Sequence, residues 1–153
     1  MNNQRKYVPE IAIEDARIIF RNFRGEEQRY NPAGKRNFCV VIPEEMEEPL
    51  IADGWNIKYL EPRDEDDRKT AYIQVAVSYD NYPPVVYMIS NGRKTLLGPE
   101  TIDLLDRAEL ETVDLVISPY VWNLSGGSGV KAYLKELYAT VKVSKFAEKY
   151  SDM

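Results

Sequence analysis

Cationic and aromatic side chains are interleaved in the segment between Arg17 and Phe38. Arginine and lysine can bind phosphate groups and a flat ring can stack on any base, so this mixture is typical of a groove for single-stranded nucleic acid. The residues that we assign to such a groove are Arg21, Phe23, Arg24, Arg29, Tyr30, Lys35 and Arg36. Phe23 suits either the groove or the core. The segment alone is equally compatible with a solvated charged hairpin over buried phenylalanines.

A second group surrounds the glycine- and serine-rich segment Asn123–Gly129, which we expect to be a loop between two strands. Trp122 precedes this segment, and Lys131, Tyr133 and Lys135 follow it. Small residues let the backbone approach a ligand closely, so we predict that Trp122 stacks on bases and that the two lysines extend the phosphate contacts. The alternative is a flexible hairpin with Trp122 in the core. The spacing of a phosphate-binding P-loop is absent.

Features that would support catalysis are few. The chain has no histidine, which removes the commonest general base and transition-metal ligand. The carboxylates of Asp64–Asp67, with Asp80 downstream, could hold Mg²⁺ for nuclease chemistry, but a run of acids is more typical of a solvated loop. Cys39 lies in the apolar run Phe38–Ile42 and is expected to be a buried hydrophobic residue. We therefore expect no enzyme activity, no catalytic residue, no metal and no cofactor.

Charge is strongly segregated along a chain whose net charge is −5 and whose pI is about 4.9. The stretch from Arg17 to Arg36 holds six basic and two acidic residues, whereas Glu100 to Asp114 holds six carboxylates and only Arg107. Because attraction to nucleic acid depends on local charge, the acidic total does not exclude a basic groove. We expect one positive face on a negative body.

Strands dominate the elements that must position these groups, and the 153 residues fit one domain with loose ends at about 1–8 and 149–153. Period-two alternation and β-branched composition predict the strands, and Asn91-Gly92 predicts a hairpin turn. The predicted strands are Ala16–Phe20, Phe38–Ile42, Trp55–Leu60, Tyr72–Tyr79, Val85–Ser90, Arg93–Leu97, Val113–Val121 and Ala132–Val143. Short helices are predicted over Pro43–Gly54 and Glu100–Leu110.

These elements indicate an all-β fold, β-rich with two short helices. A partly open five-stranded barrel with additional hairpin elements fits the length and the turn spacing. Arg17–Ile42 is predicted to form a long hairpin whose tip is rich in cations, with turn chemistry from Asn31–Gly34. Lys131–Val141 is ambiguous between helix and strand, and its β-branched end favours strand.

Four stretches carry a resemblance to a known family: Asn31–Phe38, Gly54–Lys58, Pro62–Asp67 and Gly129–Lys135. In these the chain resembles phage and prophage single-stranded DNA-binding proteins, over about residues 13–143. The resemblance implies an OB-fold, a five-stranded barrel, and sequence-tolerant binding of single-stranded DNA in bacteriophage DNA replication or DNA recombination. Many such replication proteins end in an acidic tail, whereas here the segment Lys145–Met153 has mixed charge.

The partners expected from this resemblance are single-stranded DNA and phage or host replication and recombination proteins. A homodimer is compatible with the sequence. No apolar run is long enough to span a membrane and Met1–Glu10 is polar, so we expect a cytoplasmic protein of the bacterial host without membrane contact. An acidic phage adaptor or inhibitor, which binds a host nucleic-acid enzyme through its carboxylates, is the alternative function.

Overall fold

The computed structural model describes residues 7–62, 64–65 and 68–142. Nine strands and two short helices occur within these ranges, which confirms a mostly β fold with two helices. In chain order the elements are β1 Ile11–Ile13, β2 Ile18–Asn22, β3 Arg36–Val41, α1 Glu44–Asp53, β4 Lys58–Leu60, β5 Thr70–Val77, β6 Val85–Ser90, β7 Arg93–Leu97, the 3₁₀ helix η1 Ile102–Asp106, β8 Leu110–Leu124 and β9 Gly127–Val141.

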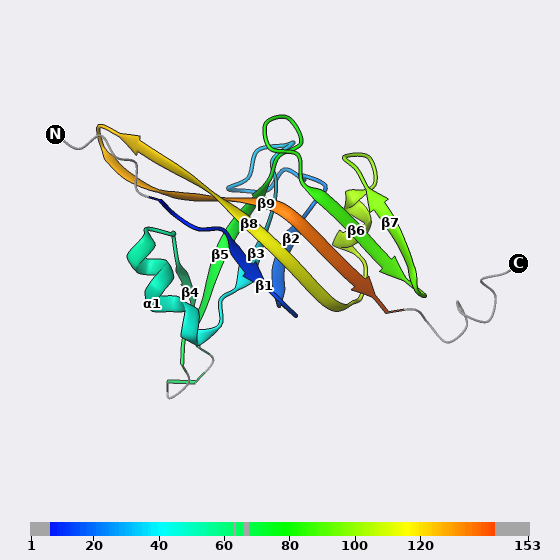
Figure 1. The fold of residues 1–153 in the computed structure, drawn as a ribbon, viewed down its shortest axis with the longest axis horizontal. Helices are drawn as coiled ribbons and strands as arrows, with labels where there is room; N and C mark the ends of the chain where they lie inside the picture. The colour runs from blue at the N-terminus through cyan, green and yellow to red at the C-terminus, as the bar shows by residue number, and fades with distance from the viewer. Residues whose placement is uncertain (1–6, 63, 66–67, 143–153) are drawn as a thin grey trace, which may run out of the picture.

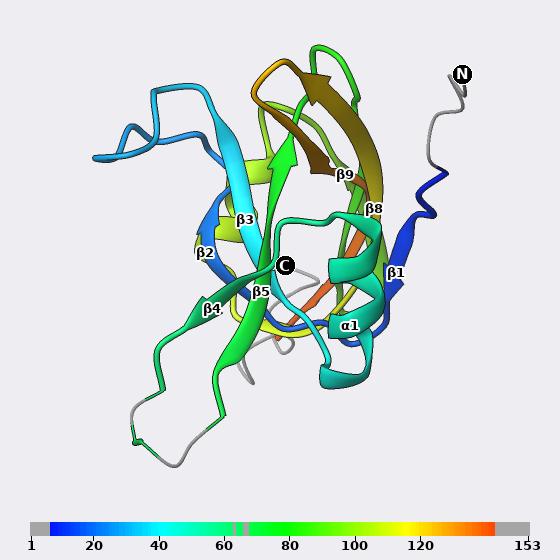
Figure 2. The same ribbon diagram turned by 90° about the vertical axis from the view of Figure 1, so that its left-hand side faces the viewer.

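The strands form one mixed sheet in the order β1-β8-β9-β5-β3-β2, with β4 added to β5 and the β6–β7 hairpin added to β9. Two of the pairings, β5–β9 and β6–β9, are parallel, and the others are antiparallel. The sheet curls around an interior, and its two end strands, β1 and β2, do not pair with each other, so it has the shape of an open barrel (Figures 1 and 2).

The core lies on the concave side of this sheet. Alternate residues of β5 and β9 point into it, including Ile73, Val75, Ala132 and Leu134, all of which are 4% exposed or less. The period of two fixes which residues remain outside, because neighbours on a strand face opposite ways. Lys131 and Lys135 therefore lie on the outer face of β9, and Tyr133 between them is only partly covered.

β8 and β9 are the longest strands, and the hairpin that they form crosses the molecule diagonally and projects beyond the body (Figure 1). The prediction of a loop over Asn123–Gly129 is wrong, because the strands continue to Leu124 and restart at Gly127, leaving only two residues in the turn. The ambiguous segment Lys131–Val141 is strand. Cross-strand pairing with β8 extends strand structure through glycine positions where propensity alone is weak.

Of the two predicted helices, the structure confirms the first as an α-helix and shortens the second. The first follows Pro43, continues through Pro49 and ends at Gly54, whose φ of 98° and backbone N–H bonds to Ile51 and Leu50 close it as predicted. The helix predicted over Glu100–Leu110 is only the 3₁₀ turn η1.

One strand boundary and one loose end need adjustment, and a further strand end lies outside the described residues. β4 covers only Lys58–Leu60, because Trp55 forms an isolated bridge to Val130. Val8, placed in a loose end, is 7% exposed, and β1 just after it pairs with β8. The predicted C-terminal strand end, Val143, lies outside the described residues, as does the loose end at 149–153.

The β2–β3 hairpin and the β6–β7 hairpin confirm their predictions. Asn91 and Gly92 both adopt positive φ, 51° and 76°, which is the conformation that an Asn-Gly hairpin turn of type I′ requires. Cys39 in β3 is 6% exposed, and burial raises the pKa of its thiol to about 11. It is a buried residue of the sheet, as expected.

Candidate nucleic-acid interface

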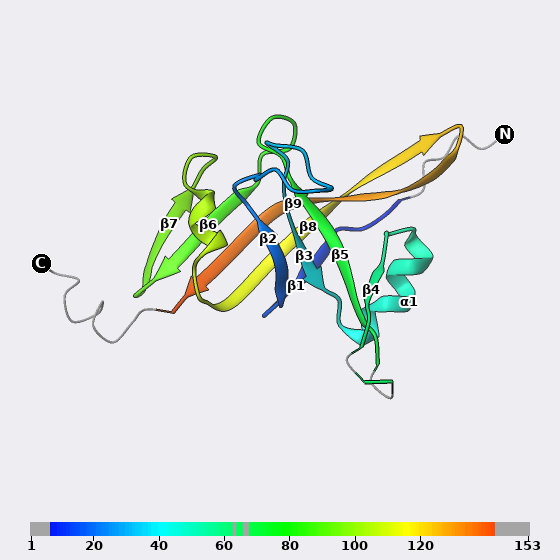
Figure 3. The same ribbon diagram turned by 180° about the vertical axis from the view of Figure 1, so that it is seen from behind.

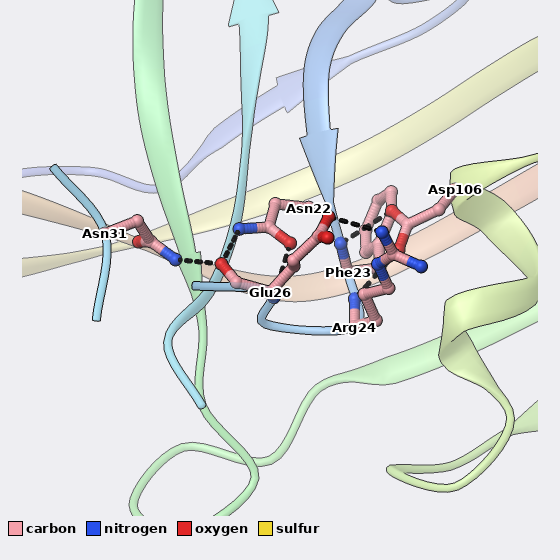
Figure 4. A network of polar contacts seen from close by, with 6 residues as sticks. All are labelled: Asn22, Phe23, Arg24, Glu26, Asn31 and Asp106. Carbon is pink, nitrogen blue, oxygen red and sulfur yellow. Dashed lines mark hydrogen bonds and ion pairs between the residues drawn. The ribbon is translucent and has the colours of Figure 1, made fainter. Parts of the chain in front are cut away.

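The connection between β2 and β3, residues 23–35, is fixed by polar contacts at its base (Figure 4). Asp106 of η1 accepts hydrogen bonds from the backbone N–H groups of Phe23, at 2.7 Å, and Arg24, at 2.9 Å. The buried side chain of Asn22 accepts from the N–H of Glu26 and donates to its carbonyl, which also accepts from Asn31. The acidic segment around η1 thus holds this connection, here called the basic arm (residues 23–35), through Asp106.

Two of the predicted phosphate-binding arginines also hold this connection. Arg21 donates to the carbonyls of Leu105 and Ala108, both at 2.8 Å, and Arg36 donates to the carbonyls of Phe23 at 2.7 Å and Pro99 at 2.8 Å. Their guanidinium groups therefore stabilise the path of the chain, a role that no local pattern in the sequence indicates. Contact of either with phosphate stays a prediction.

Phe23 is a core residue, not a stacking platform. Its side chain is fully buried and stacks on Phe38 with ring centroids 5.1 Å apart. A base cannot reach it in this structure, so the assignment of Phe23 to the groove is wrong and the alternative is correct. The cause is the inward orientation of the residue that follows β2, which packs under β3.

The remaining members of the arm are exposed. Arg24 forms an ion pair with Glu26, which offsets its charge. The guanidinium of Arg29 lies over the ring of Tyr30, 5.2 Å from its centroid, and Tyr30 is 87% exposed. Among these exposed residues of the arm, only Lys35 lines one of the two hollows described in the next paragraphs. Arg24, Arg29 and Tyr30 are exposed, line neither hollow and stay predicted contacts.

A groove of about 690 Å³, here called the central groove, runs between the β3 end of the arm and the projecting β8–β9 hairpin. Its cations are Lys35, Arg36 and Lys131. The lining residues are Asn31, Lys35, Arg36, Asn37, Gly54, Trp55, Asn56, Ile73, Gln74, Ala76, Trp122, Ser128, Gly129, Val130, Lys131 and Ala132. None of these is acidic, so the groove is positive although the protein as a whole is negative. The β3 end of the basic arm and the β8–β9 hairpin meet at this groove.

Trp122 and Gly129 face each other across the β8–β9 pair at the edge of this groove. A Cβ on Gly129 would lie 2.8 Å from Cζ2, 3.0 Å from Cε2 and 3.1 Å from Nε1 of the indole, so the ring covers the glycine backbone. Trp122 remains 37% exposed. It is a surface ring seated on the hairpin, which excludes the alternative that it belongs to the core.

A second hollow of about 610 Å³, the tyrosine hollow, shares Trp122 and Lys131 with the central groove. Tyr82, Tyr120 and Tyr133 line it, with ring centroids 4.9 to 6.3 Å apart. The ammonium group of Lys131 lies 5.0 Å from the centroid of Tyr133, so cation and ring act together. The lining of this hollow also contains no acidic residue.

Sequence reasoning missed Tyr82 and Tyr120. Tyr120 could have been found, because it lies two residues before Trp122 on β8 and so shares its face. Tyr82 follows β5 in a turn and reaches Tyr133 only through the tertiary fold. We refer to the central groove and the tyrosine hollow together as the β9 track, since Lys131 and Tyr133 of β9 run along it. Figure 3 shows β9 behind the arm and β5 from the opposite side.

The structure gives no support for a metal site in the acidic run or for a membrane-spanning helix among the residues that it describes. Asp66 and Asp67 of the acidic run lie outside the described residues. Within the described ranges no group of three or more Cys, Asp or Glu residues is arranged to hold a metal ion. None of the helices in those ranges is long and apolar enough to cross a membrane.

Comparison with known proteins is consistent with this geometry. The model of the family described as "Putative phage ssDNA-binding domain" matches residues 2–153. No curated protein sequence matches the chain.

Among solved structures, the chain is similar to the single-stranded DNA-binding protein from bacteriophage Enc34. A C-terminally truncated form matches with a TM-score of 0.56 and 12% identity, over 88% of this chain and 87% of that one. The same phage protein in complex with ssDNA matches with a TM-score of 0.54 and 12% identity, over 90% and 89%. At this identity the likeness establishes the OB-like fold, and the family match covers almost the whole sequence. The chain therefore belongs to the family of phage ssDNA-binding domains.

Proposed function

We propose that this protein binds single-stranded DNA along the β9 track, without sequence preference and without catalysing a reaction. The observation that carries the proposal is the lining of the track. It combines Trp122 and three tyrosines with Lys35, Arg36 and Lys131, and it contains no carboxylate in a protein of net charge −5. Rings supply stacking surfaces that any base can use, and the cations neutralise phosphates.

The dimensions of the track support several nucleotides. From Ser128 to Tyr133, the part of β9 that lines the track, the strand advances about 17 Å at about 3.3 Å per residue. Trp122 on its glycine seat lies at one end of this path, and the three tyrosines lie along it.

Sequence tolerance follows from which groups line the track. Base-edge readout needs hydrogen-bonding side chains that are free to meet each base. Two amides of the lining, Asn31 and Asn37, already bond to each other and to the carbonyl of Lys35. The rings and cations of the track offer stacking and charge that any base can use. Association with phage or host replication and recombination proteins, and a homodimer, stay predictions of the sequence.

The test is a fluorescence titration with oligo-dT at two salt concentrations, without Mg²⁺. We expect binding that weakens as salt rises, and a loss of about 1–3 kcal/mol of binding free energy for Trp122→Ala. Tyr59→Ala is the matched control, because Tyr59 on β4 is similarly exposed, at 42%, and does not line the track. A folded wild-type protein that binds no oligo-dT would refute the proposed function. Equal losses in the two variants would instead move the site off the β9 track.

A further inference from the structure

Beyond the tyrosine hollow lies a third hollow of about 350 Å³. It shares Tyr82 and Tyr133 with the tyrosine hollow, so the two are contiguous on the outer face. Its remaining lining includes Lys135 and Ser118, and also Glu10. Here, for the first time along the path, a carboxylate enters the lining.

Glu10 occupies the polar groups of this hollow with a single oxygen atom. Its Oε2 accepts a hydrogen bond from Nζ of Lys135 at 2.8 Å and another from Oγ of Ser118 at 3.0 Å. An ammonium and a hydroxyl that converge on one anionic oxygen are the donors that bind a phosphate oxygen of a nucleic-acid backbone. The carboxylate therefore sits where the chemistry of the hollow would accept a phosphodiester.

The position of Glu10 is imposed by its neighbours on the chain. Ile11, the next residue, begins β1 and pairs with Ile117 of β8, which immediately precedes Ser118. The side chains of Glu10 and Lys135 are 44% and 50% exposed. An exposed ion pair of this kind contributes little to folding, so stability of the sheet does not require it. The contact lowers the pKa of Glu10 and raises that of Lys135, as expected for a charged pair.

We propose that Lys135 and Ser118 form a phosphodiester subsite at the end of the β9 track, and that Glu10 occupies it in the DNA-free protein. The bound strand displaces the Glu10 carboxylate and takes over both donors. This inference rests on the proposed function, since it needs a strand that follows the track. It explains why Lys135 can belong to the binding surface although an acidic residue neutralises it in the free protein.

The first test compares Glu10→Gln with Glu14→Gln, both measured with oligo-dT across a range of salt. Glu14 is exposed and lies four residues away, and its substitution changes net charge equally. We expect Glu10→Gln to raise affinity about two- to fivefold at low salt, because the strand no longer has to displace a carboxylate from Lys135. This gain should shrink as salt rises, because salt screens the exposed Glu10–Lys135 pair that it removes. In a Lys135→Gln background the gain should disappear.

A second measurement follows the displacement itself. The pKa of the Glu10 carboxyl, determined by NMR titration, should rise when saturating oligo-dT is added, because Lys135 then pairs with phosphate. The same titration with inorganic phosphate at matched ionic strength tests whether a free anion raises the pKa of Glu10 as the strand does. A rise with oligo-dT alone supports the subsite, whereas a rise with phosphate and none with oligo-dT overturns the path of the strand. Equal affinities and salt slopes for the Glu10 and Glu14 variants, while wild type still binds, would overturn the inference and leave the proposed function standing.

Discussion

The indole of Trp122 covers the backbone of Gly129 across the β8–β9 pair, so closely that a single methyl group on Gly129 would lie 2.8 Å from the ring. The glycine thus sets the height of the Trp122 ring above the β8–β9 pair. Because Trp122 lines both the central groove and the tyrosine hollow, the orientation of this ring affects both parts of the surface.

Replacing Gly129 with alanine should displace the Trp122 ring and weaken binding of oligo-dT. The expected loss is about 1–3 kcal/mol of binding free energy, the range for one stacked base. Gly126→Ala is the control, since a Cβ at that position meets no atom within 4 Å. Equilibrium titration measures the effect, and Trp122 fluorescence reports the displacement. Equal affinities of the two variants would show that the contact between Trp122 and Gly129 does not affect binding.

The lysines of the track should account for part of the salt dependence. Lys35→Gln and Lys131→Gln should each reduce the slope of log K against log salt by about 0.7, because each removes one phosphate contact with a single strand. Lys69→Gln is the control: Lys69 pairs with Glu61 and does not line the track. Both slopes come from titrations at four or more salt concentrations. A wild-type slope in both groove variants would place the phosphates elsewhere.

Local patterns predicted the elements whose signals are contained within a few residues. The β6–β7 hairpin follows from Asn91-Gly92, and β5 follows from its β-branched alternation. β1 was not predicted, because three residues carry no clear period and the strand depends on pairing with β8. The long β8–β9 hairpin was underestimated because glycine and serine indicate a loop when their partners across the hairpin are unknown.

The same division applies to the site. Trp122, Lys131 and Tyr133, which the sequence placed in one group, line one hollow because a single hairpin brings them together. Phe23 was misassigned, since only tertiary packing shows that it turns inward. The hydrogen bonds of Arg21 and Arg36 to distant carbonyls could not be anticipated, because their acceptors lie more than sixty residues away or across the hairpin.

Asp106 should be required for the shape of the arm. Asp106→Ala removes the acceptor of two backbone N–H groups, and hydrogen bonds to a charged group contribute about 1.5–3 kcal/mol each. We expect a loss of about 3 kcal/mol in the free energy of unfolding, the low end of the sum for two such bonds because the one to Arg24 is exposed. Amide exchange at Phe23 and Arg24 should also become faster. Asp103→Ala, an exposed residue of the same η1, should leave both unchanged. Unaltered exchange at these amides in Asp106→Ala would show that other contacts hold the arm.

Cys39 should make folding sensitive to alkaline pH. Burial raises the pKa of its thiol from 9.0 to about 11, so the folded state favours the protonated form. The stability that this difference contributes is fully present below about pH 9 and is lost as the pH rises through about 11. Urea unfolding of wild type and Cys39→Ala at several pH values isolates this contribution, because other alkaline titrations are common to both proteins. We expect the two stabilities to converge or cross in that window, together with negligible thiol reactivity of the folded protein at pH 8. Rapid thiol labelling of the native protein, or a constant difference in stability up to pH 11, would contradict the buried position of Cys39.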